Sequence, residues 1–380
     1  MSIKGKVAIV GVAETDNWYI PELSPIDMMA KMAKRALDEA GIDKSEVDGL
    51  FSTSSYYYMP TLNLGEYLGI TPRYTDSTTI GGSSFVSHLL HAAAAISSGL
   101  CNVALICYGS TQRSDSGKLV SMSEKNPYEE PFGSLYPISS YALAARRHMA
   151  QYGTTSEQLA EVAVAARQWA MKNPKALKRE PLTIQDVLNS PMISSPLHKL
   201  DCCLVTDGGG AVVLTSAERA RSLKQKPVYL LGAGESHFHR GISSMPDLTE
   251  TAAKPSGDSA FKMAGVTQSD IDLLMLYDAF TINVILFLED LGFCPKGEGG
   301  SFVSNGQIAP GGRLAVNTNG GGLSNCHPGM LGIFLIIEAV RQLRGEAGER
   351  QLSKCDVALV QGNGGTLSSQ ATAILSKEPS

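Results

Sequence analysis

Ala36-Leu-Asp-Glu-Ala-Gly-Ile-Asp-Lys-Ser-Glu-Val-Asp-Gly-Leu50 decides the fold, because the chain repeats it as Ala260-Phe-Lys-Met-Ala-Gly-Val-Thr-Gln-Ser-Asp-Ile-Asp-Leu-Leu274. Two further stretches recur in the same order. Lys6-Val-Ala-Ile-Val-Gly-Val-Ala-Glu14 matches Pro227-Val-Tyr-Leu-Leu-Gly-Ala-Gly-Glu235, and Cys101-Asn-Val-Ala-Leu-Ile106 matches Cys355-Asp-Val-Ala-Leu-Val360. This repeat is longer than the period of a solenoid. The sequence therefore predicts two similar halves whose equivalent loops meet at a shared cleft.

The composition is that of an ordinary globular protein. Of the 380 residues, 43% are hydrophobic and 18% are charged, and the net charge of -5 gives no basis for nucleic-acid binding. The 7 cysteines lack the spacing of a disulfide framework or a metal site, so we expect reduced thiols and no metal. The chain leads from Met1 directly into an apolar strand, and its apolar runs are shorter than a membrane span. We therefore expect a cytoplasmic protein.

Each half reads as strand, helix and strand, followed by a glycine-rich turn, a helix and a strand. The elements expected in the first half are strand Val7–Val12, helix Ile26–Ala40, strand Val47–Phe51, turn Gly81–Ser84, helix Phe85–Ser98 and strand Val103–Cys107. Those expected in the second half are strand Ile271–Tyr277, turn Gly320–Ser324, helix Met330–Leu343 and strand Val357–Gln361. This alternation predicts an α/β fold with mainly parallel sheets.

Residues 112–200 interrupt the repeat. An insertion of this length is expected to form a subdomain, either a lid or a substrate-binding element, with a helix at Ser156–Lys172. Residues 201–225 then complete the first half. The predicted domains are therefore residues 1–111 with 201–225, the inserted subdomain 112–200, and the second half 226–380.

Motifs along the chain resemble those of the thiolase superfamily, especially the sterol-carrier-protein-type thiolases. Tyr277-Asp-Ala-Phe-Thr281 resembles the family's His-Asp-Cys-Phe or Asn-Glu-Ala-Phe box, and Asn317-Thr-Asn-Gly-Gly-Gly-Leu-Ser324 with His327-Pro-Gly329 resembles the loop that ends in the catalytic histidine. Leu291-Gly-Phe-Cys294 and Asp201-Cys-Cys-Leu-Val-Thr-Asp-Gly208 also fit. The resemblance covers nearly the whole chain. It implies a duplicated thiolase fold with five αβαβα layers and, usually, a homodimer.

The chain departs from thiolases where their nucleophile should be. The family needs a cysteine at the start of the first-half helix, where the helix dipole and nearby donors lower the pKa of the thiol. That position falls at Gly82, within one residue, and Gly81-Gly82-Ser83-Ser84 contains no cysteine. The second family cysteine belongs in Gln361-Gly-Asn-Gly-Gly365, which has none either. Because the histidine remains, this pattern favours altered chemistry over random decay.

Tyr277 and His327 are the candidate catalytic residues. The tyrosine hydroxyl can act as acid or base at a developing alkoxide, and the histidine can carry a proton or donate to an oxyanion. The other expected pocket residues are Gly82, Ser83, Gly321, Asn325, Cys326, Asn363 and Gly364. Structural roles stay open beside these: Tyr277 as a filler of the strand end, His327 as a loop support and Ser83 as a helix cap. Asp278 is expected to brace its loop, and Cys107, Cys202, Cys203, Cys294 and Cys355 are expected to be buried apolar residues.

An oxyanion pocket without an acyl-accepting cysteine suits cleavage through an enolate. The expected reaction is retro-aldol cleavage of a β-hydroxyacyl-CoA, and the chain resembles a cysteine-free branch of aldolases that shorten steroid side chains with a small zinc-ribbon/OB-fold partner. The resemblance implies a coenzyme A thioester as substrate, no permanently bound cofactor and such a partner. Two alternatives stay open. One is an acyltransferase that uses Ser83 or Cys326, and the other is a non-catalytic subunit that binds acyl-CoA or lipid.

Overall fold

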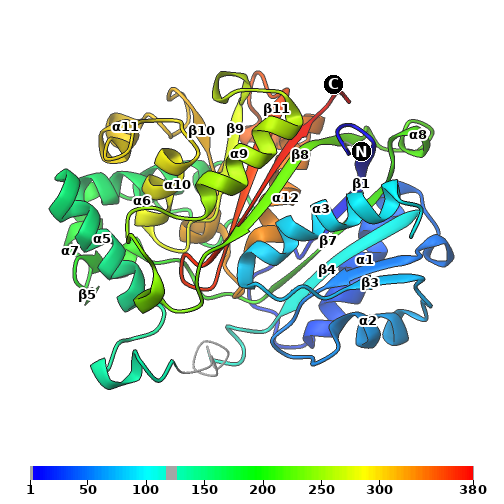
Figure 1. The fold of residues 1–380 in the computed structure, drawn as a ribbon, viewed down its shortest axis with the longest axis horizontal. Coiled ribbons are helices and arrows are strands. Elements are labelled where there is room, and N and C mark those ends of the chain that lie inside the picture. The colour runs from blue at the N-terminus through cyan, green and yellow to red at the C-terminus, as the bar shows by residue number, and fades with distance from the viewer. Residues whose placement is uncertain (1–2, 117–125, 380) are drawn as a thin grey trace.

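The computed structural model describes residues 3–116 and 126–379 (Figure 1). Residues 1–2 and 380, and residues 117–125 of the predicted insertion, lie outside the described residues. The strands of the first half are β1 (Val7–Glu14), β2 (Gly49–Ser52), β3 (Tyr74–Asp76), β4 (Val103–Ser110) and β7 (Gly208–Ser216). Those of the second half are β8 (Val228–His237), β9 (Leu273–Leu276), β10 (Ala315–Val316), β11 (Val357–Gly364) and β12 (Ser369–Ser376).

The strand order shows the duplication directly. The large sheet runs β10-β9-β11-β12-β8-β1-β7-β4-β2-β3, so the halves β3-β2-β4-β7-β1 and β10-β9-β11-β12-β8 correspond strand by strand. The halves join where β1 pairs with β8, at Ala8 with Tyr229 and at Ile9 with Val228. The predicted duplication is therefore confirmed.

The expectation of mainly parallel sheets is wrong. In each half two neighbouring pairs are parallel, and the two pairs that involve β7 or β12 are antiparallel. Residues 365–368 explain the difference in the second half, because so short a connection between β11 and β12 allows an antiparallel pair and not a parallel crossover.

The helices complete five layers. They are α1 (Pro25–Ala40), α2 (Pro60–Leu68), α3 (Ser84–Ser97), α8 (Ala217–Ala220), α9 (Ala253–Ala264), α10 (Thr281–Asp290), α11 (Gly299–Val303) and α12 (Gly332–Arg344). Helices α3 and α12 contact each other and strands of both halves, so they form the middle layer. Helix α1 covers the outer face of the first half-sheet and α9 that of the second (Figure 1). The αβαβα arrangement is thus confirmed.

Glycines at equivalent positions set how closely the outer helices approach the sheet. A Cβ atom on Gly11 in β1 would lie 2.0 Å from the carbonyl oxygen of Ala36 in α1. A Cβ atom on Gly232 in β8 would lie 2.2 Å from the carbonyl oxygen of Ala260 in α9. Both glycines and both alanines belong to the repeated stretches. The two halves therefore share the same close contact between a strand glycine and the backbone of an outer helix.

The inserted segment lies against the second half. It contains α5 (Ile138–Tyr152), α6 (Ser156–Met171), α7 (Ile184–Asn189) and the hairpin of β5 (Met192–Ser194) and β6 (Leu197–His198). Helix α6 matches the predicted one and begins at a capping box between Thr155 and Gln158. It packs against α10 and against the π-helical turn Gly321–Asn325, as the neighbouring helices in Figure 1 show. Within the part of the chain that the structure describes, no helix is both long and apolar enough to cross a membrane.

A partly buried carboxylate ties the middle layer to the first outer layer. Glu39, in the last turn of α1, pairs with Arg341 at 2.7 Å and with Arg344 at 2.5 Å, both near the end of α12. It also accepts a hydrogen bond from the backbone nitrogen of Val12. The side chain of Arg344 has no solvent exposure. Removing the charge of Glu39 would therefore leave a buried cation without its carboxylate partner.

We expect Glu39→Gln to lower the free energy of unfolding by about 2 kcal/mol, because breaking a buried ion pair costs more than breaking an exposed one. The matched control is Glu346→Gln, which removes the more exposed partner of Arg341 and should cost about 0.5 kcal/mol. Urea denaturation of both variants measures the difference. Equal losses would show that Glu39 does not tie the layers together.

Candidate active site

Tyr277 and His327 are in direct contact. Tyr277 follows β9, and His327 lies in the loop that precedes α12. The hydroxyl oxygen of Tyr277 lies 3.1 Å from Nε2 of His327, and it also accepts a hydrogen bond of 3.1 Å from the backbone nitrogen of Leu331. Both side chains are buried, with 4% of Tyr277 and 8% of His327 exposed. The structure thus places the two predicted catalytic residues within proton-transfer distance.

Burial keeps both members of this pair uncharged at neutral pH. It lowers the pKa of His327 to about 4, and it raises the pKa of Tyr277 well above its usual value of 10. One lone pair of the tyrosine oxygen is taken by the Leu331 N–H group. The phenolic hydrogen is then available to the unprotonated Nε2 of a neutral His327.

The ring of Tyr277 occupies the space in front of Gly82. A Cβ atom on Gly82 would lie 2.3 Å from Cε2 and 2.4 Å from the hydroxyl oxygen of Tyr277. Real Cβ atoms do not approach other atoms so closely. Gly82 is the position at which the motif resemblance requires a nucleophilic cysteine. A cysteine at residue 82 and a tyrosine ring in this orientation therefore exclude each other.

The equivalent loops of the two halves meet backbone to backbone. A Cβ atom on Gly81 would lie 2.6 Å from the backbone nitrogen of Gly365, and one on Gly332 would lie 2.4 Å from the carbonyl oxygen of Gly82. At Gly364 a Cβ atom would overlap the carbonyl group of Ile80. Gly82 and Gly364 thus line the junction: a side chain at residue 364 would displace the opposite loop, and one at residue 82 would displace the ring of Tyr277.

Ser83 is part of this junction but is not poised as a nucleophile. Its side chain is fully buried and donates a hydrogen bond of 2.9 Å to the carbonyl oxygen of Ile80. It also lies 2.8 Å from the hydroxyl of Ser369, which in turn lies 2.9 Å from Nδ1 of His237. It makes no capping hydrogen bond to α3, so the capping role is not found. Because its hydroxyl hydrogen is directed to a carbonyl, a base does not activate it.

The loop that contains Gly321 wraps around Asp278. The carboxylate accepts hydrogen bonds from the backbone nitrogens of Gly322 at 2.7 Å and Leu323 at 3.3 Å. Burial raises the pKa of Asp278 to about 7, although these hydrogen bonds oppose the shift. The N–H group of Gly321 itself donates to Asn319. Asp278 therefore braces the loop as expected, and the amide of Gly321, which was expected only as a pocket residue, is already bonded.

Asn325 and Cys326 make their contacts away from the Tyr277 hydroxyl. The side-chain oxygen of Asn325 lies 3.4 Å from the amide of Asn173, and its amide lies 3.6 Å from the thiol of Cys326. Cys326 is completely buried, which raises the pKa of its thiol well above the usual value. A buried thiol that stays protonated is a poor nucleophile. The structure therefore gives no support to Cys326 as a relocated nucleophile.

Asn363 is held by residues that the sequence did not single out. Its amide group donates to the hydroxyl of Tyr141 at 2.9 Å, and its oxygen accepts from Gln370 at 2.7 Å. Tyr141 comes from α5 of the inserted segment and stacks on Phe280 with ring centroids 4.4 Å apart. Asn363 therefore anchors the insertion to β11. The sequence could not predict this hydrogen bond, because Tyr141 belongs to no motif and stands alone in a long insertion.

The sequence also did not predict that Cys203 lies beside the site, with its thiol buried although the residue as a whole is partly exposed. Cys202, Cys203 and Cys294 are partly exposed, so the expectation that all of these cysteines are buried is wrong. The backbone nitrogen of Cys203 donates to the carbonyl oxygen of Ala279, two residues after Tyr277. Burial of its thiol and the charge of Asp278 both raise its pKa. A thiol thus lies beside the site, but in the protonated form.

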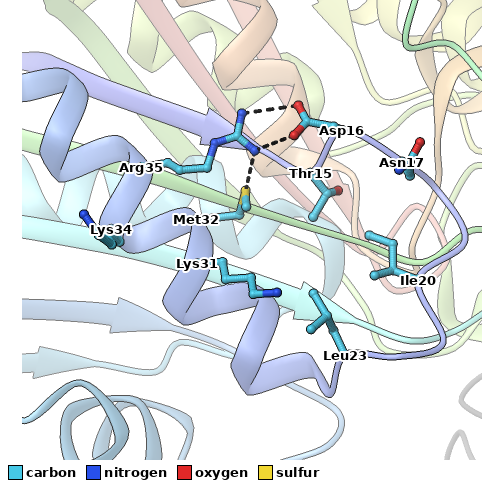
Figure 2. A pocket seen from close by; sticks show the side chains of 9 residues that line it. All are labelled: Thr15, Asp16, Asn17, Ile20, Leu23, Lys31, Met32, Lys34 and Arg35. Carbon is cyan, nitrogen blue, oxygen red and sulfur yellow. Dashed lines mark hydrogen bonds and ion pairs between the residues drawn. The ribbon is translucent and has the colours of Figure 1, made fainter.

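The cavity shown in Figure 2 is separate from this pair. It has a volume of about 330 Å³ and is lined by Thr15, Asp16, Asn17, Ile20, Leu23, Lys31, Met32, Lys34 and Arg35. Figure 2 shows Arg35 pointing toward Asp16, with which it forms an ion pair of 2.9 Å. None of the predicted site residues belongs to its lining. Across residues 3–116 and 126–379, no group of three or more histidine, cysteine or acidic side chains is arranged to hold a metal ion.

Known proteins resemble this chain over most of its length. Residues 234–377 match the thiolase C-terminal domain-like family. The chain is 34% identical to an acetyl-CoA acetyltransferase of Methanothermobacter thermautotrophicus, over 98% of this chain and 99% of that protein. It is also 34% identical to a 17-hydroxy-3-oxo-4-pregnene-20-carboxyl-CoA lyase of Mycobacterium tuberculosis, over 90% and 92%. Among solved structures, the Ltp2-ChsH2(DUF35) aldolase is similar, with a TM-score of 0.90, 31% identity and 98% coverage of each chain.

We expect Gly82→Ala to lower the free energy of unfolding by about 2 kcal/mol, since the new methyl group overlaps the ring of Tyr277. In a Tyr277→Ala background the ring is absent, and the same change should cost less than about 0.5 kcal/mol. Denaturant unfolding of the two single variants and the double variant measures this coupling. Equal costs in both backgrounds would mean that the ring does not fill the space in front of Gly82.

Proposed function

This chain belongs to the thiolase superfamily, and from that we propose that it is an acyl-CoA lyase that cleaves a carbon–carbon bond by retro-aldol chemistry. The substrate is a β-hydroxyacyl-CoA. The observation that carries the proposal is the mutual exclusion of a side chain at residue 82 and the ring of Tyr277. The chain has a buried acid–base pair where the family has its acyl acceptor.

In the proposed reaction the Tyr277–His327 pair takes the proton of the β-hydroxyl group. The hydroxyl proton passes to the oxygen of Tyr277 as that residue passes its own proton to Nε2 of His327. This relay avoids a free tyrosinate, which the raised pKa of Tyr277 disfavours. The lowered pKa of His327 leaves its ring neutral, and thus able to accept a proton, at neutral pH, although it also makes the ring a weaker base than an exposed histidine.

The remaining electron flow is fixed by the substrate. The electrons of the former O–H bond form a carbonyl group on the β-carbon, the bond between the α- and β-carbons breaks, and its electron pair forms the thioester enolate. The proton stored on His327 returns through Tyr277 to the α-carbon. The products are a ketone or aldehyde and a shorter acyl-CoA, and all atoms and protons are accounted for.

Acyl transfer is the second candidate, because one full-length relative is named an acetyl-CoA acetyltransferase. It needs a nucleophile, and the available groups are poorly suited. Ser83 donates to a carbonyl oxygen, and the thiol of Cys326 is buried and protonated. Incubation with a radiolabelled acyl-CoA followed by acid quench tests this candidate, since a stable acyl adduct would favour it over the lyase.

The substrate side chain and the assembly belong to the same proposal. We propose a steroid or another branched acyl group, supported by the 17-hydroxy-3-oxo-4-pregnene-20-carboxyl-CoA lyase that resembles this chain. The name of the structurally similar aldolase, Ltp2-ChsH2(DUF35), joins it to a DUF35 protein, which supports our proposal of a small zinc-ribbon/OB-fold partner for this chain. We also propose a homodimer. Assays should therefore be run with and without the co-expressed partner.

We expect Tyr277→Phe to lower kcat for retro-aldol cleavage by about 10²–10⁴-fold, because it removes the group that accepts the hydroxyl proton. The matched control is Tyr229→Phe, which changes another buried tyrosine outside the site and should leave kcat within about twofold. Release of the ketone and the shorter acyl-CoA is followed by mass spectrometry. Retained activity in Tyr277→Phe would exclude the proposed relay.

The pH dependence of kcat/KM gives an independent measurement. Because His327 must be neutral to accept a proton and burial lowers its pKa to about 4, activity should fall as the pH drops through about 4. A solvent-exposed histidine would produce the same fall near pH 6.5. Stopped-flow pH jumps from neutral solution separate this titration from slow acid unfolding. An acidic limb near pH 6.5 that persists in short jumps would contradict the role given to His327.

A further inference from the structure

The loop that carries His327 is held by tyrosine hydroxyls from both halves of the molecule. From the second half, Tyr277 accepts a hydrogen bond from the backbone nitrogen of Leu331 at 3.1 Å. From the first half, Tyr108 in β4 donates to the carbonyl oxygen of Pro328 at 2.5 Å and accepts from the backbone nitrogen of Met330 at 3.2 Å. The loop between His327 and α12 is thus fixed from two sides.

Tyr108 has a buried hydroxyl group, which interacts with Ser110 of its own strand as well as with the loop. Its side chain is 2% exposed, and its ring packs against Phe85 of α3 and Phe334 of α12, with centroids 4.9 Å and 6.5 Å away. These neighbours hold the ring within the middle layer. The hydroxyl therefore extends from a rigid strand to the loop and meets two backbone groups that are themselves buried.

The loop has little freedom to find another position while these contacts exist. A Cβ atom on Gly329 would lie 2.4 Å from the side-chain oxygen of Gln112 and 3.3 Å from the hydroxyl of Tyr108. His327 itself exchanges hydrogen bonds with Thr206, whose hydroxyl accepts from the His327 nitrogen at 3.1 Å. Among the residues that hold this loop, Tyr108 comes from the first half-sheet, and it binds Pro328 and Met330 directly after His327.

We propose that Tyr108 is a positioning residue that sets the distance and orientation of His327 relative to Tyr277. The expected effect of Tyr108 on kcat rests on the proposed lyase function, whereas its effect on the position of His327 does not. Without the Tyr108 hydroxyl, the Pro328 carbonyl and the Met330 N–H group must find water or move. Either change displaces the adjacent His327 from a hydrogen bond that is 3.1 Å long.

The pKa of His327 depends on its burial and on the ionisable groups around it. The Tyr277 hydroxyl faces Nε2, and Cys326 is the preceding residue in the chain. The Asp278 carboxylate accepts a hydrogen bond from the backbone nitrogen of Gly322. Gly322 lies beside the His327 ring, since a Cβ atom added to this glycine would lie 3.3 Å from Cδ2 of His327. Burial is the dominant influence on the His327 pKa. Loosening the loop admits water, which favours the protonated ring and moves its pKa upward.

The test is Tyr108→Phe, examined first by NMR titration of protein labelled at histidine, with the His327 resonance assigned from its loss in His327→Asn. We expect the His327 pKa to rise by about one unit or more, and Tyr229→Phe to leave it unchanged. In the lyase assay, kcat should fall about 10–100-fold with KM within about twofold. The acidic limb of kcat/KM should move to higher pH by the same amount as the NMR titration.

A second variant protects the test against a loss of folding in Tyr108→Phe. Gly329→Ala leaves Tyr108 intact but pushes the loop away from Gln112 and the Tyr108 hydroxyl, so it should raise the His327 pKa in the same direction. An unchanged His327 titration in both variants would overturn the proposal. If the unmodified protein has no lyase activity either with or without the co-expressed partner, the proposed function fails, and the NMR titration still decides the role of Tyr108.

Discussion

The structure depends on the close approach of two backbones at the junction of its halves. A Cβ atom on Gly81 would meet the backbone of Gly364 and Gly365, one on Gly364 would meet the carbonyl group of Ile80, and one on Gly332 at the start of α12 would meet the carbonyl oxygen of Gly82. This contact brings the starts of α3 and α12 together in the middle layer. A bulky residue at any of these positions would separate the halves, and the site between them would be lost.

One aromatic ring accounts for both unusual features of the site. The ring of Tyr277 takes the volume in front of Gly82, so the covalent nucleophile of the family cannot be present. The same ring brings a hydroxyl to His327. The absence of a side chain at residue 82 and the contact between Tyr277 and His327 are therefore one structural feature. A thiolase that had only lost its nucleophile would not need a tyrosine ring in this place.

Much of the fold could be predicted because the chain repeats itself. The repeated stretches located the first outer helix and the order of elements, and the motifs located Tyr277 and His327, whereas the glycine contacts beneath the outer helices were not predicted. The direction of β7 and β12 could not be predicted, because strand direction depends on connections and not on composition. The contacts of Gly321 and Asn363 were also missed. Their partners, Asp278 and Tyr141, are set by how loops fold around buried polar groups, which leaves no periodic pattern in the sequence.

The depth of the Tyr277–His327 pair has a consequence for the fate of the hydrogen. With 4% and 8% of these side chains exposed, bulk water has little access to the pair during a turnover. In the proposed lyase reaction, the hydrogen of the substrate hydroxyl group would then stay on the imidazole and reach the carbanion before it exchanges with solvent. The hydrogen found on the α-carbon of the shorter acyl-CoA would then come from the β-hydroxyl group of the same substrate molecule and not from solvent.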